Sequence, residues 1–185
     1  IEEPLLESRS LINDPNAVPY DLSKADGQKI VLEFCEKDLD ASIIHPTSIV
    51  GPNDFKPGLP MQEMVNLANG KRKLLPNWGY NFVDVRDVAI AHVNALTKGA
   101  DRERYIIHKK GLWMKEIGQA LTQSLPKKYA TRRLPSSLAY ILAFFHPKLS
   151  VKQLKGSLGT HVGYDVGDSL SALDLPDYDI GTTLV

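Results

Sequence analysis

A short apolar run that ends at a proline constrains the fold of this chain more than any other feature. Residues 39–46 read Leu-Asp-Ala-Ser-Ile-Ile-His-Pro, a pattern typical of a buried parallel strand that stops at a loop. A helical pattern over 20–37 precedes the run, and a Gly-Pro turn at 51–52 follows it. Helix, buried strand and turn in this order predict an α/β fold. In open sheets of that kind, ligands bind beyond the carboxyl ends of the strands.

Tyr20 and Lys24 stand at the start of the helical pattern, four residues apart. In a helix such residues lie on one face, with their Cβ atoms about 5–6 Å apart. A free phenol has a pKa of about 10, and a nearby cation favours the phenolate and lowers that value. The pair is therefore a candidate acid/base for carbonyl or alcohol redox chemistry. The alternative is a surface Tyr and Lys on an ordinary amphipathic helix.

The same spacing occurs at Tyr105 and Lys109, but in a short β-branched run that reads as a strand. A strand rises about 3.3 Å per residue, so residues four apart are about 13 Å apart. Only the first pair is therefore expected to act as a unit.

A third pattern, over residues 81–93, passes from strand alternation into helix periodicity. Asp84 or Asp87 is placed to cap the helix that follows. Further helices are predicted over 61–69, 87–98, 113–125 and from 136 onward, and further strands over 73–75 and 105–107.

Three ordered motifs carry a resemblance to a known family: Tyr-x-x-Ser-Lys at 20–24, Pro-x-x-x-x-Gly-Pro at 46–52, and Phe-Val-Asp-Val-Arg-Asp-Val-Ala-x-Ala-His at 82–92. The chain is similar to the second half of an extended short-chain dehydrogenase/reductase, in the NAD-dependent epimerase/dehydratase superfamily. It most resembles the dihydroflavonol-reductase-like and 3β-hydroxysteroid-dehydrogenase-like reductases, and more distantly the nucleotide-sugar epimerases and dehydratases.

The resemblance implies the C-terminal part of a Rossmann-like NAD(P)-binding fold of the α/β class, plus a smaller, mostly helical substrate domain. Residues 1–50 would belong to the cofactor domain and 51–185 to the substrate domain, with about 86–108 returning to the cofactor domain. Such reductases pass hydride between the nicotinamide of NAD or NADP and a ketone or secondary alcohol.

The resemblance also implies the site residues. Tyr20 would be the catalytic acid/base, and Lys24 would hold the nicotinamide ribose. The cofactor would also be approached by Pro46, Thr47, Ser48 and Ile49. The substrate pocket would be lined by Asn53, Phe55, Leu59, Met61, Tyr80 and Phe82, each equally consistent with a core or loop position. An apolar lining without a dense set of Arg favours a bulky apolar ketone, or a flavonoid-like or steroid-like alcohol.

Two family features are absent from the sequence. No Gly-x-x-Gly-x-x-Gly turn follows a strand, so the backbone cradle for a pyrophosphate is missing. Ser8 and Ser10 are the only hydroxyl side chains before Tyr20, and neither is assigned the family's catalytic role. His45 stands where relatives commonly have Arg. We therefore expect the C-terminal portion of a longer protein, inactive without its missing N-terminal half. The alternatives are a nucleotide-sugar epimerase or dehydratase, and a non-catalytic dinucleotide-binding scaffold.

The charges balance, with 22 Lys and Arg against 22 Asp and Glu. The basic residues read as dispersed, which implies neither nucleic acid nor an anionic membrane as a partner. The cluster 71–73 is most simply a solvated face, with contact to an anionic substrate or a cofactor phosphate as the alternative. The apolar run 138–145 is far short of the roughly 20 residues that span a bilayer. A buried or interface helix is favoured there over peripheral membrane contact.

Cys35 is the single cysteine, which excludes an internal disulfide and favours a reducing, cytoplasmic location. The five His lack metal-ligand spacing, so no metal site is predicted. The helix over 20–37 carries apolar residues on more than one stripe, which is more than one sheet face needs. Family members pair this helix in dimers, so we predict a homodimer with Ile30, Val31 or Phe34 in an isologous contact. The alternative places these side chains in the core.

Overall fold

The structure, a computed structural model, describes residues 5–15, 17–126, 129–145, 158–159, 163–164, 167–176, 178–179 and 183. Its helices are α1 (Pro19–Cys35), α2 (Leu59–Ala68), α3 (Val85–Lys98), α4 (Met114–Ser124), α5 (Ser136–Phe145) and α7 (Gly167–Ala172). Its strands are β1 (Ile43–Pro46), β2 (Ser48–Val50), β3 (Gly79–Asp84), β4 (Arg104–Ile107) and β5 (Lys110–Trp113). The predicted helices and the strand over 105–107 are present. The strand predicted over 73–75 is reduced to a single bridge between Leu75 and Arg133.

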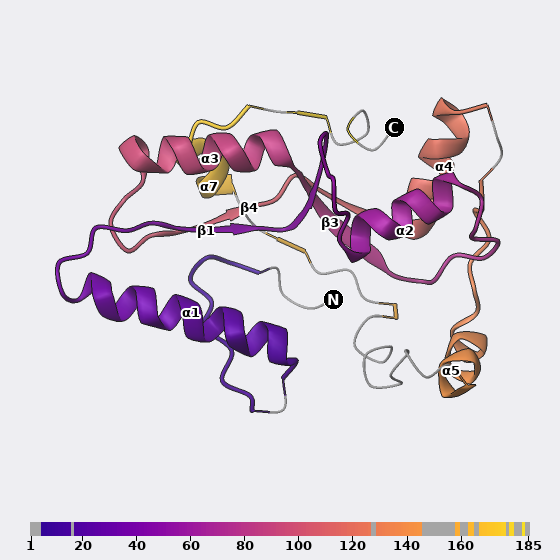
Figure 1. Cartoon of the computed structure of the whole chain (residues 1–185), viewed down its shortest axis with the longest axis horizontal. Coiled ribbons are helices and arrows are strands. Elements are labelled where there is room, and N and C mark those ends of the chain that lie inside the picture. The colour runs from indigo at the N-terminus through magenta and orange to yellow at the C-terminus, as the bar shows by residue number, and fades with distance from the viewer. Residues whose placement is uncertain are drawn as a thin grey trace.

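Two small sheets form the framework of the chain (Figure 1). In the first, β1 and β4 pair in parallel, with Ile43 opposite Arg104 and Pro46 opposite Ile107. In the second, β3 is parallel to β2 on one side and antiparallel to β5 on the other. The predicted α/β class with a parallel strand pair is confirmed. The second sheet also contains β2 and β5, two strands that were not predicted, beside the predicted strand at the start of 81–93.

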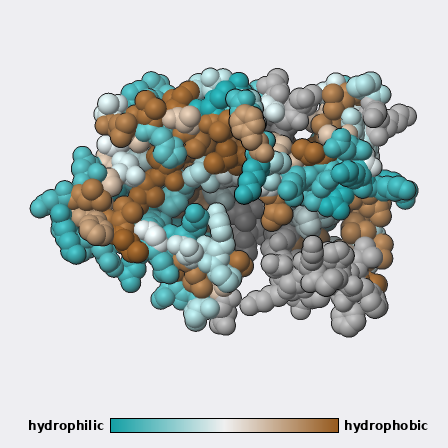
Figure 2. All heavy atoms as spheres, viewed as in Figure 1, coloured by the Kyte–Doolittle hydropathy of each residue, from teal (hydrophilic) through white to brown (hydrophobic). Residues whose placement is uncertain are grey.

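The β1–β4 pair lies between α3 and α1 (Figure 1). Alternate strand residues point to opposite faces, so Ile44 and Ile107 share one face and pack with Val88 of α3. His45 and Ile106 belong to the other face, which is turned toward α1. Figure 2 shows apolar surface along the space between the two helices, where β1 runs. The α3 face of this pair is therefore packed, and the α1 face is open.

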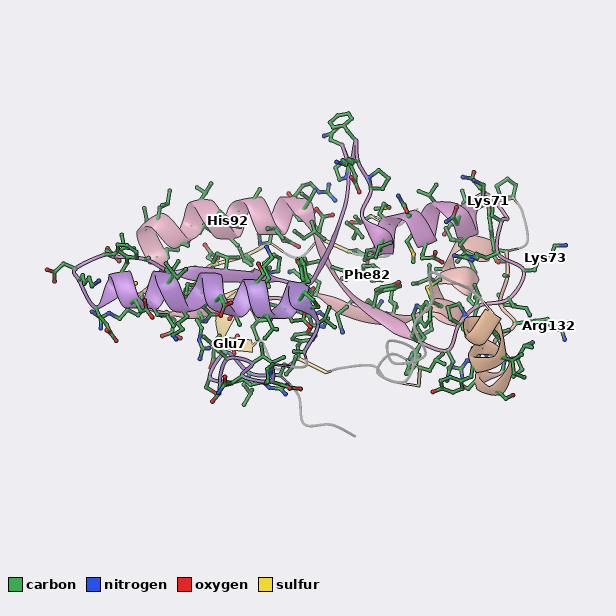
Figure 3. The ribbon with its side chains drawn as sticks, turned by 60° about the horizontal axis from the view of Figure 1, so that its bottom comes forward. Glu7, Lys71, Lys73, Phe82, His92 and Arg132 are labelled. Carbon is green, nitrogen blue, oxygen red and sulfur yellow. The ribbon has the colours of Figure 1, made fainter. Side chains whose placement is uncertain are left out.

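The second sheet closes a core with α2 and α4. Phe82 is fully buried between β3 and α2 (Figure 3). The other buried members of this core are Val50, Met64, Leu67, Leu75, Met114, Ile117 and Leu121. The elements between β2 and α4 therefore cover one another's apolar faces.

Asp84 joins β3 to α3 and caps the helix, as predicted. Its Oδ1 accepts a hydrogen bond from the Arg86 backbone N–H at 2.7 Å, and its carboxylate also accepts from the Arg86 guanidinium and the Thr183 hydroxyl. The Gly-Pro turn lies against Val85, the first residue of α3. Gly51 has a φ of +146°, and a Cβ there would lie 2.6 Å from Val85 Cγ1. Only glycine fits that position.

Three further predictions concern the burial of Cys35, the apolar run 138–145 and the length of the helices. Cys35 is buried, as expected of a small core residue. The apolar run lies in α5, which spans ten residues. Among the residues that the structure describes, no helix is both long enough and apolar enough to cross a membrane.

Candidate active site

Helix α1 places Tyr20 and Lys24 one turn apart on the same face. The helix begins at Pro19, whose fixed φ suits the first helical position and whose missing N–H is not needed there. Lys24 Nζ lies 5.4 Å from the centre of the Tyr20 ring, within the range of a cation–π contact. Tyr20 is 67% exposed, so a reactant can reach this side chain. The geometry is that of an accessible phenol with a cation held beside it.

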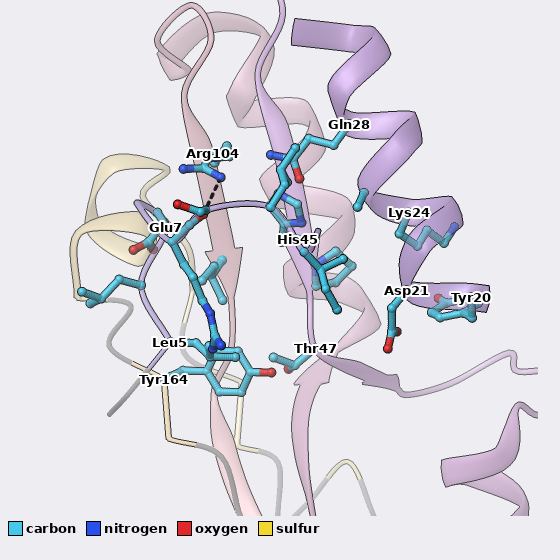
Figure 4. A pocket seen from close by; sticks show the side chains of 18 residues that line it. Leu5, Glu7, Tyr20, Asp21, Lys24, Gln28, His45, Thr47, Arg104 and Tyr164 are labelled. Atoms are coloured by element: carbon cyan, nitrogen blue, oxygen red, sulfur yellow. Dashed lines mark hydrogen bonds between the residues drawn. The ribbon is translucent and has the colours of Figure 1, made fainter. Parts of the chain in front are cut away.

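A cavity of about 620 Å³ opens between α1, the β1–β4 pair and the segment 5–12 (Figure 4). Tyr20 and Lys24 lie along its α1 wall, and Pro46 and Thr47 lie at the end of β1. The structure therefore brings together four of the predicted cofactor-binding residues. Two others lie in β2, outside this lining: Ser48 and Ile49.

The loop after β1 is tied to the end of β4. Both the backbone N–H and the Oγ1 hydroxyl of Thr47 donate to the Ile107 carbonyl, at 3.0 and 3.3 Å. These bonds fix Pro46 and Thr47 at the carboxyl end of two parallel strands. That edge is where open α/β sheets bind ligands.

Gln28 and His45 line the inner part of the cavity, from α1 and from β1 (Figure 4). Gln28 is 9% exposed, and its Nε2 has no hydrogen-bond partner among the described residues. A buried donor left in that state costs about 1–3 kcal/mol. Burial lowers the pKa of the His45 imidazole, Arg104 lowers it further and Glu7 opposes them, so the ring is neutral at neutral pH. The inner wall thus presents an unsatisfied donor and a neutral imidazole.

The six predicted substrate-lining residues do not lie along this cavity. Three belong to the core of the second sheet or pack against it: Phe82, Tyr80 and Met61. Three are exposed on the segment 53–59: Asn53, Phe55 and Leu59. Phe82 has no exposed surface in this structure, so its role here is packing. The part of the other five in substrate binding stays a prediction.

Sequence reasoning missed most of the inner wall. The place of Gln28 in the site could have been predicted, because it follows Lys24 by four residues and so shares the helix face. Arg104 reaches the cavity through the register of β1 with β4. Tyr164 reaches it because the chain at 163–164 pairs with Leu5. Neither of these long-range contacts leaves a local pattern in the sequence.

The chemistry within reach of this site is proton transfer and positioning. The Tyr20 hydroxyl is both a donor and an acceptor, and the Lys24 ammonium carries three donors. In the described part of the chain, no three His, Cys, Asp or Glu side chains gather where they could hold a metal ion.

The chain belongs to the NAD dependent epimerase/dehydratase family, whose model matches residues 2–107. The match includes α1, β1 and the loop at Thr47, which together form most of the cavity wall. The family that the sequence motifs predicted is confirmed. A nicotinamide dinucleotide is the cofactor class of that family, as predicted.

Curated relatives that match the chain include a sterol demethylase protein and a reductase. Sterol demethylase protein B from Methylococcus capsulatus is 33% identical over 88 residues, which cover 48% of this chain and 27% of the relative. A putative dihydroflavonol 4-reductase from Synechocystis sp. is 26% identical over 182 residues, which cover 89% of this chain and 52% of the relative. The chain thus spans between about a quarter and about a half of the length of these two relatives.

Solved structures share the fold. A nucleoside-diphosphate-sugar epimerase from Pseudomonas aeruginosa superposes with a TM-score of 0.77 at 19% identity, covering 98% of this chain and 58% of that one. Gre2 from Candida albicans, in complex with NADPH, superposes with a TM-score of 0.60 at 21% identity, covering 89% of this chain and 48% of that one. These likenesses confirm that the chain holds part of a Rossmann-like reductase or epimerase fold.

Proposed function

We propose that the complete protein containing this chain is an NAD(P)-dependent reductase that interconverts an apolar ketone and the corresponding secondary alcohol. The observation that carries the proposal is the Tyr20–Lys24 pair, held on one helix face beside a cavity at the carboxyl ends of parallel strands. Membership of an NAD-dependent family supplies the cofactor class.

The cavity residues fit the nicotinamide end of a dinucleotide. Lys24 would donate to the ribose hydroxyls, and Pro46 and Thr47 would flank the ring at the strand ends. The Gln28 amide, buried and without a partner among the described residues, gives the inner wall a donor for a polar ligand group. When bound, NADPH or NADH supplies the hydride.

Tyr20 would manage the proton. In the reductive direction its hydroxyl donates to the carbonyl oxygen as that oxygen gains negative charge, which leaves a phenolate. The Lys24 ammonium stabilises the phenolate electrostatically. Because Tyr20 is exposed, the phenolate regains its proton from solvent. In the oxidative direction the phenolate accepts the proton of the alcohol.

The character of the cavity supports an apolar substrate. Its apolar side chains include Leu5, Leu6, Leu11, Ile12, Pro46 and Ile106. A sugar nucleotide needs a set of Arg donors for its diphosphate, and one of the two Arg here, Arg104, donates to the Arg9 carbonyl. The names of the two curated relatives, a sterol demethylase protein and a dihydroflavonol reductase, agree with a polycyclic apolar substrate.

The proposal includes a further segment of the same protein that completes the cofactor site. Only Gln28 and Cys35 are buried in α1, which has 17 residues, and among the described strands β1 pairs with β4 alone. The segment would pair with the free edge of β1 and carry a glycine-rich pyrophosphate turn. The 185-residue chain alone should then be inactive and bind NADPH very weakly. Calorimetric titration checks this, and tight binding by the chain alone would contradict it.

We also infer a homodimer through α1. Ile30 and Phe34, 53% and 54% exposed, lie one turn apart on one face, and a two-fold contact would present this face from both subunits. Light scattering should show a dimer for the complete protein and a folded monomer for Phe34→Asp. A monomeric parent protein would exclude the inference.

The test of the proposed chemistry is Tyr20→Phe in the complete protein. The variant keeps the ring beside Lys24 and removes only the transferable proton, so turnover of a ketone should fall by about 10²–10⁴-fold. Affinity for NADPH, measured by fluorescence titration, should stay nearly unchanged. Tyr129→Phe is the matched control, because that ring packs against the core of the second sheet and should leave turnover intact.

Lys24→Ala separates the two roles of the lysine. It should lower both turnover and NADPH affinity, whereas Lys29→Ala, on the same helix and exposed, should change neither.

Near wild-type turnover by Tyr20→Phe would show that the proton comes from another group.

A further inference from the structure

The balanced charge of the chain conceals a strongly basic stretch. Residues 117–164 contain no Asp or Glu, and their basic residues are Lys127, Lys128, Arg132, Arg133, Lys148, Lys152 and Lys155. The rest of the chain is therefore net acidic. We expected the basic residues to be dispersed along the chain, and this distribution corrects that expectation.

The fold brings a second basic segment beside this stretch. The Leu75 N–H donates to the Arg132 carbonyl at 2.9 Å, and the Leu134 N–H donates to the Leu75 carbonyl at 2.7 Å. These bonds hold the segment 71–75 alongside 132–134. Figure 3 shows Lys71, Lys73 and Arg132 at the same end of the molecule as α5.

Three of the cations at this end have no ion-pair partner among the described residues. Arg72 forms an ion pair with Glu63, and the Arg133 guanidinium lies 5.9 Å from the centre of the Trp113 ring. Lys71, Lys73 and Arg132 are exposed, and none of them forms an ion pair with a residue that the structure describes.

Exposed apolar side chains occur in the segment 71–75 and in helix α5, which follows 132–134 in the chain. Leu74, between the two segments, is 39% exposed. Helix α5 begins at Ser136, and its Leu138 and Ile141 are 39% and 55% exposed and lie one turn apart on one face. We name the set Lys71, Lys73, Leu74, Arg132, Leu138 and Ile141 the basic-apolar end.

We propose that the basic-apolar end docks on the surface of a lipid bilayer that carries anionic headgroups. Lys and Arg near such a surface are attracted to it, and a short helix that exposes Leu and Ile can bury them at the boundary between headgroups and acyl chains. Nucleic acid would use the cations but gain nothing from Leu138 and Ile141. The docking is peripheral, and it uses a part of the chain that the proposed proton transfer does not.

Vesicle co-sedimentation of the complete protein tests the proposal. The protein should bind vesicles that contain phosphatidylglycerol and should not bind vesicles of phosphatidylcholine alone. Lys71→Glu/Lys73→Glu should weaken binding by about 30-fold or more, since each Lys lost near an anionic leaflet weakens it about fivefold. Lys29→Glu/Lys37→Glu makes the same change in net charge on α1 and in the turn after it, and should bind like the wild type.

A second variant separates a bilayer from a soluble polyanion. Leu138→Ser/Ile141→Ser keeps every cation, and its binding to the phosphatidylglycerol vesicles should be clearly weaker than that of the wild type. Its binding to a short double-stranded RNA, if any, should match the wild type. Equal binding of vesicles by this variant and the wild type, equal loss in the two Lys variants, or no wild-type binding to either vesicle would overturn the proposal.

Discussion

Two helices of this chain, α4 and α1, show how differently its two regions are closed. In its 11 residues α4 buries Met114, Ile117, Gly118 and Leu121 against the second sheet. In its 17 residues α1 buries only Gln28 and Cys35. The region around the second sheet therefore buries its apolar side chains within the chain. The helix with the candidate catalytic pair leaves most of its side chains exposed or half-buried.

The difference teaches that, among the described residues, the candidate active site lies in the more open part of the fold. Its cavity is bounded by α1 on one side and on the other by the pair β1–β4, in which β1 has no second partner among the described strands. Under the proposal, a cofactor and a further chain segment complete this wall, where the buried Gln28 donor has no partner among the described residues. The closed region provides the rigid support, through β3 and the Asp84 cap of α3.

The largest contrast should come from two mid-helix glycines. A Cβ at Gly118 of α4 would lie 2.2 Å from the Ala130 carbonyl oxygen, so Gly118→Ala should destabilise the chain by about 1–3 kcal/mol. A Cβ at Gly27 of α1 meets nothing within 4 Å, so Gly27→Ala should stabilise it by about 0.5–1 kcal/mol through helix propensity. Urea unfolding of both variants measures the two values. Destabilisation of similar size at Gly27 would show that α1 is packed as tightly as α4.

A smaller effect should appear in the response to acid. The Arg86 guanidinium, chiefly, and the Thr183 hydroxyl lower the pKa of Asp84 from 3.8 to about 2, against the opposing effect of burial. Because the pKa is lowered in the fold, this stabilisation is complete above pH 3.8 and is lost as the pH falls toward 2. Asp84→Asn should therefore be less stable than the wild type at neutral pH, and the gap should shrink over that range.

Denaturant unfolding at stepped pH measures the gap. Asp26→Asn, at an exposed position of α1, is the control and should match the wild type at neutral pH. A gap for Asp84→Asn that stays constant down to pH 2 would show that the carboxylate is not the stabilising form.

Local patterns predicted the elements that local physics decides. The helix of Tyr20 and Lys24, the strand before Pro46 and the cap at Asp84 follow from periodicity, a proline and a capping side chain, and each is present. The parallel orientation of β1 agrees with the prediction for 39–46, whereas its pairing with β4 in particular was not predicted. The chemistry-bearing pair was therefore visible in the sequence.

Long-range packing was not visible in the same way. The sequence did not indicate which side of β3 would face α2, so Phe82 was predicted to line the substrate pocket and is instead core. Arg104 and Tyr164 reach the cavity only through pairings between distant segments. The even charge count likewise concealed a basic stretch that the fold places beside 71–73.

Hydrogen exchange of α1, in the 185-residue chain and in the complete protein, tests most directly whether the active-site helix is completed from outside this chain. Amides protected only by weak packing exchange through local opening. In the 185-residue chain, α1 should exchange much faster than β3 and α4, and in the complete protein with NADPH it should become as protected as they are. Equal, strong protection of α1 in both samples would contradict the account.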